Sequence, residues 1–348
     1  MYSRLGLSAV SERVVDAVAD YAEQHRIPLM LIASRNQVDD DLPDGGYCGL
    51  SRMELVARVR RRSPTYTFVC RDHGGPYFAA DDDGLSPTAA SERARGSLRQ
   101  DVDAGFDLVH VDWSRSGGDV VGETRELIAE LVDRAAPQEI AFEVSVAETD
   151  GSVDHPIDFA RTFERFADLA PVIEFAAART GSLVRSAYQA GSFDYSAAKE
   201  IVAFAHRLGM RFKEHNVDYS PCKDLRMRTL AGVDAINIGP ELGVLETRIL
   251  ARLASLHGAT PELEALFAVA AASGRWRKWT VRTPASRMQA LLAAHYCHAT
   301  SEYRALIEKL DRRVDVDATI RSKLSARIDA YVRCLAVPAQ SSGERYAG

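Results

Sequence analysis

The stretch Val69-Cys70-Arg71-Asp72-His73-Gly74-Gly75-Pro76 decides the fold. It starts as an apolar strand and turns into a loop at its two glycines. Asp72, a potential acid or base, and His73, a potential metal ligand, stand at that junction. In a (β/α)8 barrel, catalytic groups lie where the strands end and the following loops begin. The stretch therefore predicts such a barrel, with its chemistry at the carboxyl ends of the strands.

Four other short apolar runs end in the same way, with polar side chains at or just beyond the end of the run. These runs are Leu108-Val109-His110-Val111-Asp112, Ala141-Phe142-Glu143, Arg211-Phe212-Lys213-Glu214-His215 and Ala235-Ile236-Asn237-Ile238-Gly239. Polar groups at successive strand ends indicate one shared site.

Runs rich in Val, Ile, Leu, Phe and Tyr alternate with amphipathic stretches, which predicts βα units on a parallel sheet. The predicted strands lie near residues 4–8, 29–34, 66–71, 107–112, 140–145, 183–189, 210–215 and 234–239. The predicted helices between them include 10–25, 51–62, 87–104 and 119–136. An open doubly wound sheet is the alternative, but the chain has neither a G-x-G-x-x-G turn nor a P-loop. The pattern favours a closed α/β (β/α)8 TIM barrel.

After Gly239 the pattern changes to helices alone, over 241–257, 261–273, 285–297, 301–311 and 315–335. We predict three parts: a barrel over 1–240, a helical extension packed on the barrel over 241–337, and a disordered tail of small polar residues over 338–348.

The composition limits the kinds of partner that we expect the protein to bind. With 46% hydrophobic residues, 26% charged residues and a net charge of −6, the chain has no electrostatic reason to bind nucleic acid or an anionic membrane. No apolar run is long enough to span a membrane, and no basic head precedes an apolar core at the N-terminus, so we expect a cytoplasmic protein without a signal peptide. The five scattered cysteines, without a CxxC pair, are expected to be reduced thiols.

A divalent metal site is the main prediction. His73, Glu143 and His215 end the third, fifth and seventh predicted strands, so alternate strands would bring them to one side of the barrel mouth. Neutral imidazole and carboxylate groups suit divalent cations, with Zn²⁺ the expected ion. A lone histidine at a strand end is more often structural, but three candidate ligands at equivalent ends favour a shared ion.

Two carboxylates are the catalytic candidates. A carboxylate beside a cation in a partly dry mouth can exchange a proton with a substrate hydroxyl, and Asp72 fits this role, although it could instead cap the next loop. Glu143 is expected to serve in catalysis as well as in the metal shell. Asp112 could bind substrate hydroxyls or join the metal shell, with a salt bridge to Arg115 as the alternative.

Further residues are candidates for substrate binding. The amides of Asn36 and Gln37 can read hydroxyl groups, and a simple turn is the competing interpretation. Lys213 points to the same side as His215, because strand side chains alternate with a period of two. It could form a Schiff base with a ketose carbonyl, and a buried ion pair explains it equally well. Asp218 anchors its loop or contacts substrate.

Several motifs together resemble the GatZ/KbaZ-type subunit of class II D-tagatose-bisphosphate aldolase. They are Ser34-Arg35-Asn36-Gln37-Val38, Gly45-Gly46-Tyr47, Asp72-His73-Gly74-Gly75-Pro76, His110-Val111-Asp112, Glu143-Val144, Gln189-Ala190-Gly191, Glu214-His215-Asn216-Val217-Asp218-Tyr219 and Ile238-Gly239-Pro240. The resemblance implies a metal-dependent class II aldolase-like barrel in carbohydrate metabolism. Members of this family are described as non-catalytic partners of a separate aldolase subunit, and relatives are similar to sugar epimerases.

The chain departs from catalytic class II aldolases at two places. Gln189 stands where those enzymes carry a further metal-binding histidine before a glycine, and the run Asn237-Ile238-Gly239-Pro240 lacks their phosphate-binding pattern. Gln189 and Gly239 are therefore kept as substrate-binding candidates, and a substrate with fewer phosphates, or with none, is plausible.

The expected activity is that of a metal-dependent enzyme acting on a ketose or ketose phosphate, by aldol cleavage and condensation or by epimerisation, through an enediolate-like intermediate. The alternative is a non-catalytic subunit that stabilises a class II tagatose-bisphosphate aldolase. A lysine aldolase using Lys213 is a third hypothesis. The expected partners are a sugar or sugar phosphate, and a second copy of the chain or a catalytic aldolase subunit.

Overall fold

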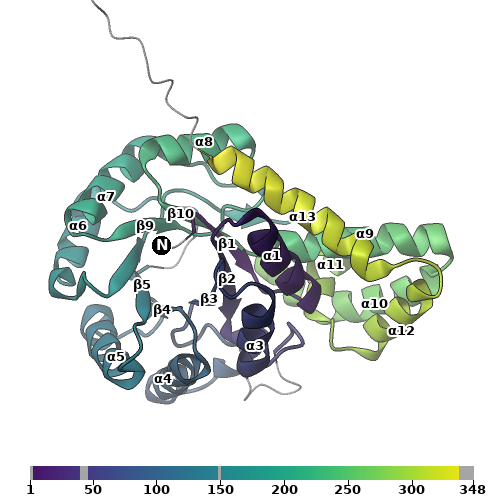
Figure 1. Cartoon of the computed structure of the whole chain (residues 1–348), viewed down its shortest axis with the longest axis horizontal. Coiled ribbons are helices and arrows are strands. Elements are labelled where there is room, and N and C mark those ends of the chain that lie inside the picture. The colour runs from purple at the N-terminus through teal and green to yellow at the C-terminus, as the bar shows by residue number, and fades with distance from the viewer. Residues whose placement is uncertain (1–2, 40–45, 148–149, 337–348) are drawn as a thin grey trace, which may run out of the picture.

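The computed structural model describes residues 3–39, 46–147 and 150–336. Eight parallel strands close into a barrel in the order β1-β10-β9-β6-β5-β4-β3-β2, which confirms the predicted TIM barrel (Figure 1). The barrel strands are β1 (Leu5–Ser8), β2 (Leu29–Ser34), β3 (Thr67–Asp72), β4 (Leu108–Asp112), β5 (Ala141–Ser145), β6 (Ile173–Ala177), β9 (Arg211–Glu214) and β10 (Ala235–Ile238).

One predicted strand is wrong. Residues 183–189 form a small antiparallel hairpin outside the barrel, made of β7 (Val184–Arg185) and β8 (Tyr188–Gln189). The sixth barrel strand is β6, which pairs with β5 and β9. Its sequence Ile-Glu-Phe-Ala-Ala contains good helix formers, so local propensity does not predict a strand here. Pairing with the two neighbouring strands stabilises the extended conformation.

Helices surround the barrel, and serine side chains cap the first turns of several of them. The Ser11 hydroxyl accepts from Val14 N at the start of α1, and Ser86 caps α4 just before Pro87. The helices before the C-terminal region are α1 (Glu12–His25), α2 (Arg35–Val38), α3 (Arg52–Arg62), η1 (Ala80–Asp82), α4 (Pro87–Ala104), α5 (Val120–Ala135), α6 (Pro156–Glu164), η2 (Ala167–Leu169), α7 (Tyr195–Arg207) and α8 (Cys222–Ala231).

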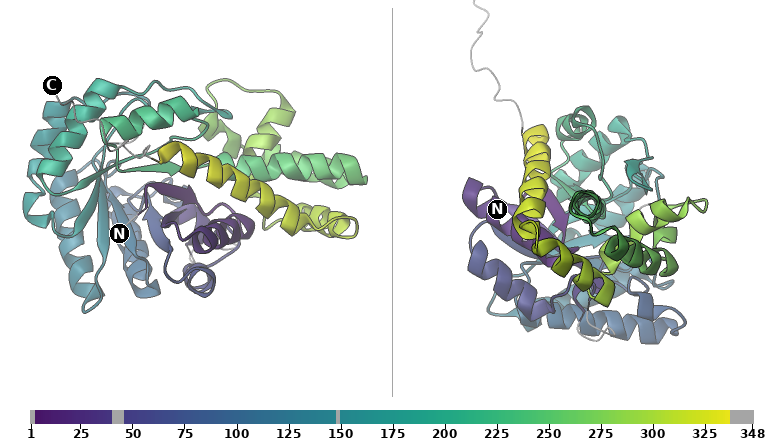
Figure 2. Two further views of the ribbon diagram at one scale, coloured as in Figure 1. Left: turned by 45° about the horizontal axis from the view of Figure 1, so that its top comes forward. Right: turned by 90° about the vertical axis from the view of Figure 1, so that its right-hand side faces the viewer.

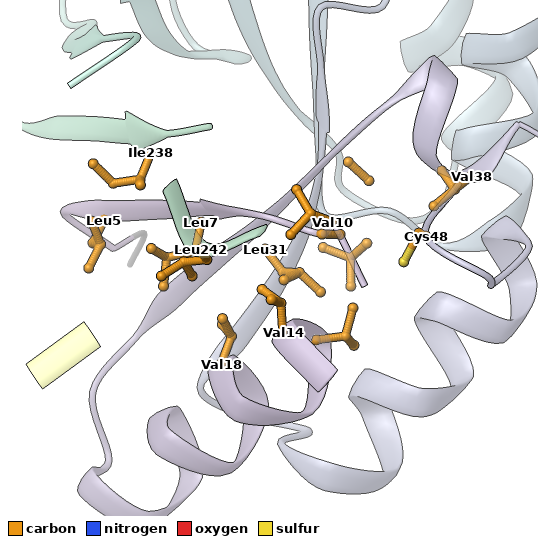
Figure 3. Packing of buried hydrophobic residues seen from close by; sticks show 14 of the residues in the cluster. Leu5, Leu7, Val10, Val14, Val18, Leu31, Val38, Cys48, Ile238 and Leu242 are labelled. Carbon is orange, nitrogen blue, oxygen red and sulfur yellow. The ribbon is translucent and has the colours of Figure 1, made fainter. Parts of the chain in front are cut away.

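Strand side chains alternate between two environments. Outward residues such as Leu7 and Leu31 pack against Val14 and Val18 of α1 in the main core (Figure 3). Burial of each such side chain contributes about 1.5–3 kcal/mol. Inward residues near the amino ends of the strands form a separate apolar floor inside the barrel. The buried members of this floor are Met30, Ile32, Cys70, Leu108, Phe175 and Ala235.

The chain continues after β10 as a helical C-terminal region. It comprises α9 (Glu241–His257), α10 (Thr260–Ala272), η3 (Arg275–Trp279), α11 (Ser286–Ala293), η4 (Ala294–Tyr296), α12 (Ser301–Asp311) and α13 (Val316–Leu335). Helix α9 runs away from the barrel, and α13 returns to pack on α1 and α8 (Figures 1 and 2). The last helix thus completes the outer ring between the first and the last strand. The division of domains at residue 240 stays a prediction, and the predicted tail lies outside the described residues.

A disulfide between Cys222 and Cys334 joins α8 to α13, with Cα atoms 5.2 Å apart. The expectation of five thiols is therefore wrong for this pair, whereas Cys48, Cys70 and Cys297 are buried thiols. The two partners are 112 residues apart in the chain and become neighbours only when α13 packs beside α8. A link across so long a loop restricts the unfolded chain and stabilises the fold. Among the helices of the described residues, none combines the length and apolarity that crossing a bilayer requires.

Candidate functional site

A polar layer lies above the apolar floor, at the carboxyl ends of the strands. The period of two along each strand puts alternate residues on the inside of the barrel. On β4, for example, His110 and Asp112 share this side, and His110 lies in register with Glu143 of β5. The inward polar residues are Asp72, His110, Asp112, Glu143, Ser145, Lys213, His215 and Asn237.

Two glycines bring His73 into this layer. The loop after β3 crosses directly over the end of β4, where Gly74 N donates to His110 O at 3.0 Å. A Cβ atom on Gly75 would lie 1.5 Å from Asp112 O, so this crossing excludes any larger residue. His73 itself has a φ of 47°, a left-handed conformation that few non-glycine residues adopt. The backbone is strained at this point, which is typical of functional sites.

His73 is held by a buried carboxylate. Its Nδ1 lies 2.6 Å from Asp112 Oδ2, and Ser114 donates to the other oxygen of Asp112 from both N and Oγ. Burial would raise the pKa of Asp112, but the hydrogen bond from His73, the charges of His110 and His73 and the hydrogen bond from Ser114 together outweigh it and hold that pKa well below its usual range. Asp112 is therefore ionised, and Nδ1 of His73 carries the proton. This leaves a lone pair on Nε2, as in carboxylate–histidine–metal triads.

His215 is held in the same way from another strand. Its Nε2 lies 2.5 Å from Glu143 Oε1, and Lys213 Nζ donates to Glu143 Oε2 at 2.7 Å. All three side chains are almost fully buried. Burial opposes ionisation of Glu143, but the Lys213 charge and the histidines outweigh it, so the pKa of this carboxyl lies well below its usual range. Nε2 of His215 thus carries the proton, and Nδ1 presents a lone pair.

The two lone pairs face each other. His215 Nδ1 lies 3.2 Å from His73 Nε2, and Asp72 Oδ1 lies 3.7 Å and 3.9 Å from the same two nitrogens. Two acceptors at this distance repel each other unless a proton or a metal ion lies between them. Burial lowers the pKa of His73, but Asp72 and Asp112 raise it by more, so the site favours positive charge. Two nitrogens bound to one tetrahedral zinc ion are about 3.4 Å apart, so the donor set fits a divalent metal.

A third imidazole completes this cluster, although the sequence did not single it out as a ligand. Ligand atoms of His73, His110 and His215 all lie within 4.8 Å of one another. Nδ1 of His110 accepts from His73 N, and its Nε2 lies 2.9 Å from Ser145 Oγ. Burial lowers the pKa of His110 to about 4, so this ring is neutral, as a metal ligand must be.

Glu143 occupies a different place from the one expected of a ligand. Its two oxygens contact the other ring nitrogen of His215 and the Lys213 ammonium. In this geometry Glu143 orients the His215 ring and balances the positive charge of Lys213. Its role as a ligand or catalytic group stays a prediction.

Gln37 and Gln189, two predicted substrate-binding residues, use their amides to hold the scaffold. Gln37 is buried, accepts from Ser34 N and donates to Ser8 Oγ. Gln189 accepts from Leu183 N and donates to Asn216 O, which ties the β7–β8 hairpin to the loop after His215.

Asn36 holds the loop after β3, donating to Phe78 O and accepting from Ala80 N, and it also lines the cleft beside His73. Gly45, in the adjoining predicted loop, lies outside the described residues.

Asp218 and Gly239, also predicted to bind substrate, are bonded to each other. The backbone N–H groups of Gly239 and Glu241 donate to the Asp218 carboxylate, each at 2.9 Å, and Asp218 is fully buried. This carboxylate secures the start of α9.

Asp218 gives the fold a pH dependence. Burial, followed by the nearby Glu241 charge, raises the pKa of Asp218 to about 7 from an ordinary 3.8. The folded state therefore binds a proton more readily than the unfolded state, and stability falls as the pH rises from about 4 through 7. We expect Asp218→Asn to reduce the fall in Tm between pH 5 and pH 8. An exposed carboxylate, Asp158, supplies the control Asp158→Asn. If Tm fell equally with pH in Asp218→Asn and in the unmodified protein, this assignment would be contradicted.

A cleft of about 550 Å³ opens beside His73. Its walls include Phe78, Arg115, Arg185, Lys278 and Trp279. Arg185 and Lys278 were not predicted as site residues, because nothing in their local sequence shows that the hairpin and η3 reach the barrel mouth. Arg115 was considered only as a partner of Asp112. In the structure Asp112 bonds His73 and Ser114, and Arg115 donates to Tyr77 O.

No family model matches the chain. Among solved structures, it is similar to a probable tagatose 6 phosphate kinase from Sinorhizobium meliloti 1021, with a TM-score of 0.74 and 20% identity, covering 95% of this chain and 93% of that one. It is also similar to a fructose-bisphosphate aldolase from Campylobacter jejuni, with a TM-score of 0.59 and 14% identity, covering 96% and 90% of the two chains. At such identities the likeness shows the fold alone, a TIM barrel with a helical C-terminal region.

Proposed function

We propose that the protein is a divalent-metal enzyme that acts on a ketose or ketose phosphate, by aldol cleavage and condensation or by epimerisation. The observation that carries this proposal is the 3.2 Å approach of His73 Nε2 and His215 Nδ1 at the barrel mouth, with the other nitrogen of each ring bonded to a buried carboxylate. The names of the similar structures, a tagatose 6 phosphate kinase and a fructose-bisphosphate aldolase, support sugar phosphate chemistry.

His73 and His215 would hold the ion. His110 lies beside them, but its Nδ1 accepts from His73 N, so it would join the ion only after giving up that hydrogen bond. A nitrogen-rich donor set suits Zn²⁺. When bound, the ion supplies Lewis acidity that polarises a carbonyl group, with an effect of several kcal/mol. Asp112 and Glu143 keep both rings in the tautomer that offers a lone pair, so the site is organised before substrate arrives.

Asp72 is the group best placed to move a proton. Burial raises the pKa of its carboxyl, but the charges of His73 and His215 more than offset this, so that Asp72 is ionised at neutral pH. Its side chain remains 16% exposed, unlike that of Glu143, and Asn237 Nδ2 lies 3.4 Å from its Oδ1. In aldol cleavage, Asp72 accepts the proton of a substrate hydroxyl as the carbon–carbon bond breaks. Condensation returns that proton, and addition to the other face of the carbonyl gives the epimer.

The lysine aldolase hypothesis has less support. Lys213 is fully buried, donates to Glu143, and lies 5.1 Å from the centroid of the Phe175 ring. An ammonium group paired with a carboxylate is not a nucleophile.

The experiment compares metal-free, zinc-loaded and untreated protein, with ketoses and ketose phosphates as substrates and NMR detection of aldehydes and epimers. We expect bound metal in the untreated protein, turnover in the loaded protein, and loss of turnover after chelation. A correctly folded, zinc-loaded protein that converts none of these substrates would contradict the proposal and leave the non-catalytic subunit as the alternative.

A further inference from the structure

We infer that the cleft beside His73 is an anion subsite, in which Arg115, Arg185 and Lys278 bind the phosphate of a ketose monophosphate. This inference rests on the proposed function and names its substrate class. The cleft adjoins the ring that presents the candidate metal ligand, and its volume of about 550 Å³ lies within the usual range for small-molecule sites. A substrate carbonyl at His73 and His215 would leave the distal end of the sugar in this cleft.

The three cations come from three separate segments. Arg115 follows β4, Arg185 ends β7, and Lys278 lies in η3 of the C-terminal helical region. Two carboxylates, Asp83 and Asp150, also line the cleft. The Asp150 carboxylate lies 3.3 Å from Arg179, which also pairs with Asp154 at 2.6 Å, and it accepts from Ser152. The lining side chains thus comprise three cations and two carboxylates, an excess of positive charge that suits a phosphate group.

Arg115 is fixed relative to the metal site by an aromatic ring. Phe78 stacks on His73 with centroids 4.9 Å apart and planes at 14°, and the Arg115 guanidinium lies 4.2 Å from the centroid of the same ring. Arg115 also donates to Tyr77 O at 2.7 Å. A planar guanidinium in a fixed position suits bidentate binding of phosphate.

The other two cations stand on segments that are joined to each other. Ser186 N, in the hairpin turn, donates to Trp279 O at 2.6 Å, which connects the neighbours of Arg185 and Lys278. Lys278 and Trp279 line the same cleft as His73. The rim of the cleft is thus a connected structure beside His73.

The backbone around the cleft is strained. Among the described residues, six that are not glycine have a positive φ, and four of these lie in the loops that form the cleft: His73, Tyr77, Ser186 and Asn216. Such strain concentrates at ligand sites. One cationic rim provides for one phosphate.

The test is calorimetric titration of folded, metal-free protein with fructose, fructose 6-phosphate and inorganic phosphate. The variants are Arg185→Gln, Lys278→Gln and the double variant, and the matched control is Arg287→Gln, which removes a surface charge paired with Glu264. We expect fructose 6-phosphate to bind more tightly than fructose, and each cleft variant to weaken phosphate and fructose 6-phosphate binding about tenfold. If the double variant fails to fold, binding by the two single variants tests the inference.

Equal binding of fructose and fructose 6-phosphate, or unchanged binding in folded cleft variants, would overturn the inference. Because binding is measured without metal or turnover, the two proposals can fail separately. A protein that binds phosphate through these cations but is inert would refute the proposed function alone. An enzyme that converts phosphorylated and free ketoses with equal KM would refute the subsite alone.

Discussion

His73→Ala is expected to abolish detectable zinc binding and, with it, turnover of any ketose substrate. His73 supplies one of the two lone pairs that face each other across 3.2 Å, and the remaining ring of His215 cannot hold an ion alone. Loss of a partner that merely orients a ligand typically costs 10–100-fold in metal affinity, so loss of the ligand itself should exceed about 100-fold. Zinc binding is measured by competition with a chromophoric chelator.

Two further variants distinguish the loss of a metal ligand from a general effect on folding. Asp112→Asn keeps the His73 ring but weakens the bond that sets its tautomer, and should show the intermediate loss of about 10–100-fold. His206→Ala removes an exposed imidazole that is also bonded to a carboxylate, Asp234, but lies outside the barrel mouth. It should bind zinc normally. Stoichiometric zinc in folded His73→Ala would refute the assignment.

Lys213→Met is expected to destabilise the fold by about 3–5 kcal/mol, because it leaves a buried carboxylate without its main counter-charge. Lys213 and Glu143 are at most 1% exposed, and within the polar layer Lys213 lies next to Phe175 of the apolar floor. Urea unfolding followed by circular dichroism measures the loss. The double variant Lys213→Met with Glu143→Gln removes both charges and should recover part of it.

A loss below about 1 kcal/mol in Lys213→Met would show that Glu143 does not depend on this ion pair. Lys213 also allows a test of the lysine aldolase hypothesis. Borohydride treatment of the unmodified protein with a ketose phosphate should leave no covalent adduct at Lys213, since the ammonium is buried and paired.

Local sequence predicted most of the barrel because each strand carries its own signal: a short apolar run that ends in polar groups. Local sequence does not reveal β6, where alanines and Glu174 are typical of a helix and pairing with the neighbouring strands determines the conformation. It also could not predict that α13 closes the outer ring, or that Cys334 reaches Cys222, because both depend on packing across more than 100 residues.

The candidate site likewise has features that local sequence predicts and features that it does not. Asp72, His73 and His215 could be predicted to converge, because strand ends share one edge of the barrel. The individual hydrogen bonds could not be predicted, since residue type does not distinguish an amide that binds substrate from Gln189, which ties two loops together. Nor could the sequence show that His110 stands beside His73 and His215 or that Lys278 reaches the cleft.

The most direct measurement is anomalous diffraction at the zinc edge from crystals of the zinc-loaded protein. We expect one strong peak at the barrel mouth, about 2.1 Å from both His73 Nε2 and His215 Nδ1. A fully loaded crystal with no peak between these nitrogens, or with zinc bound only at another place, would contradict this expectation.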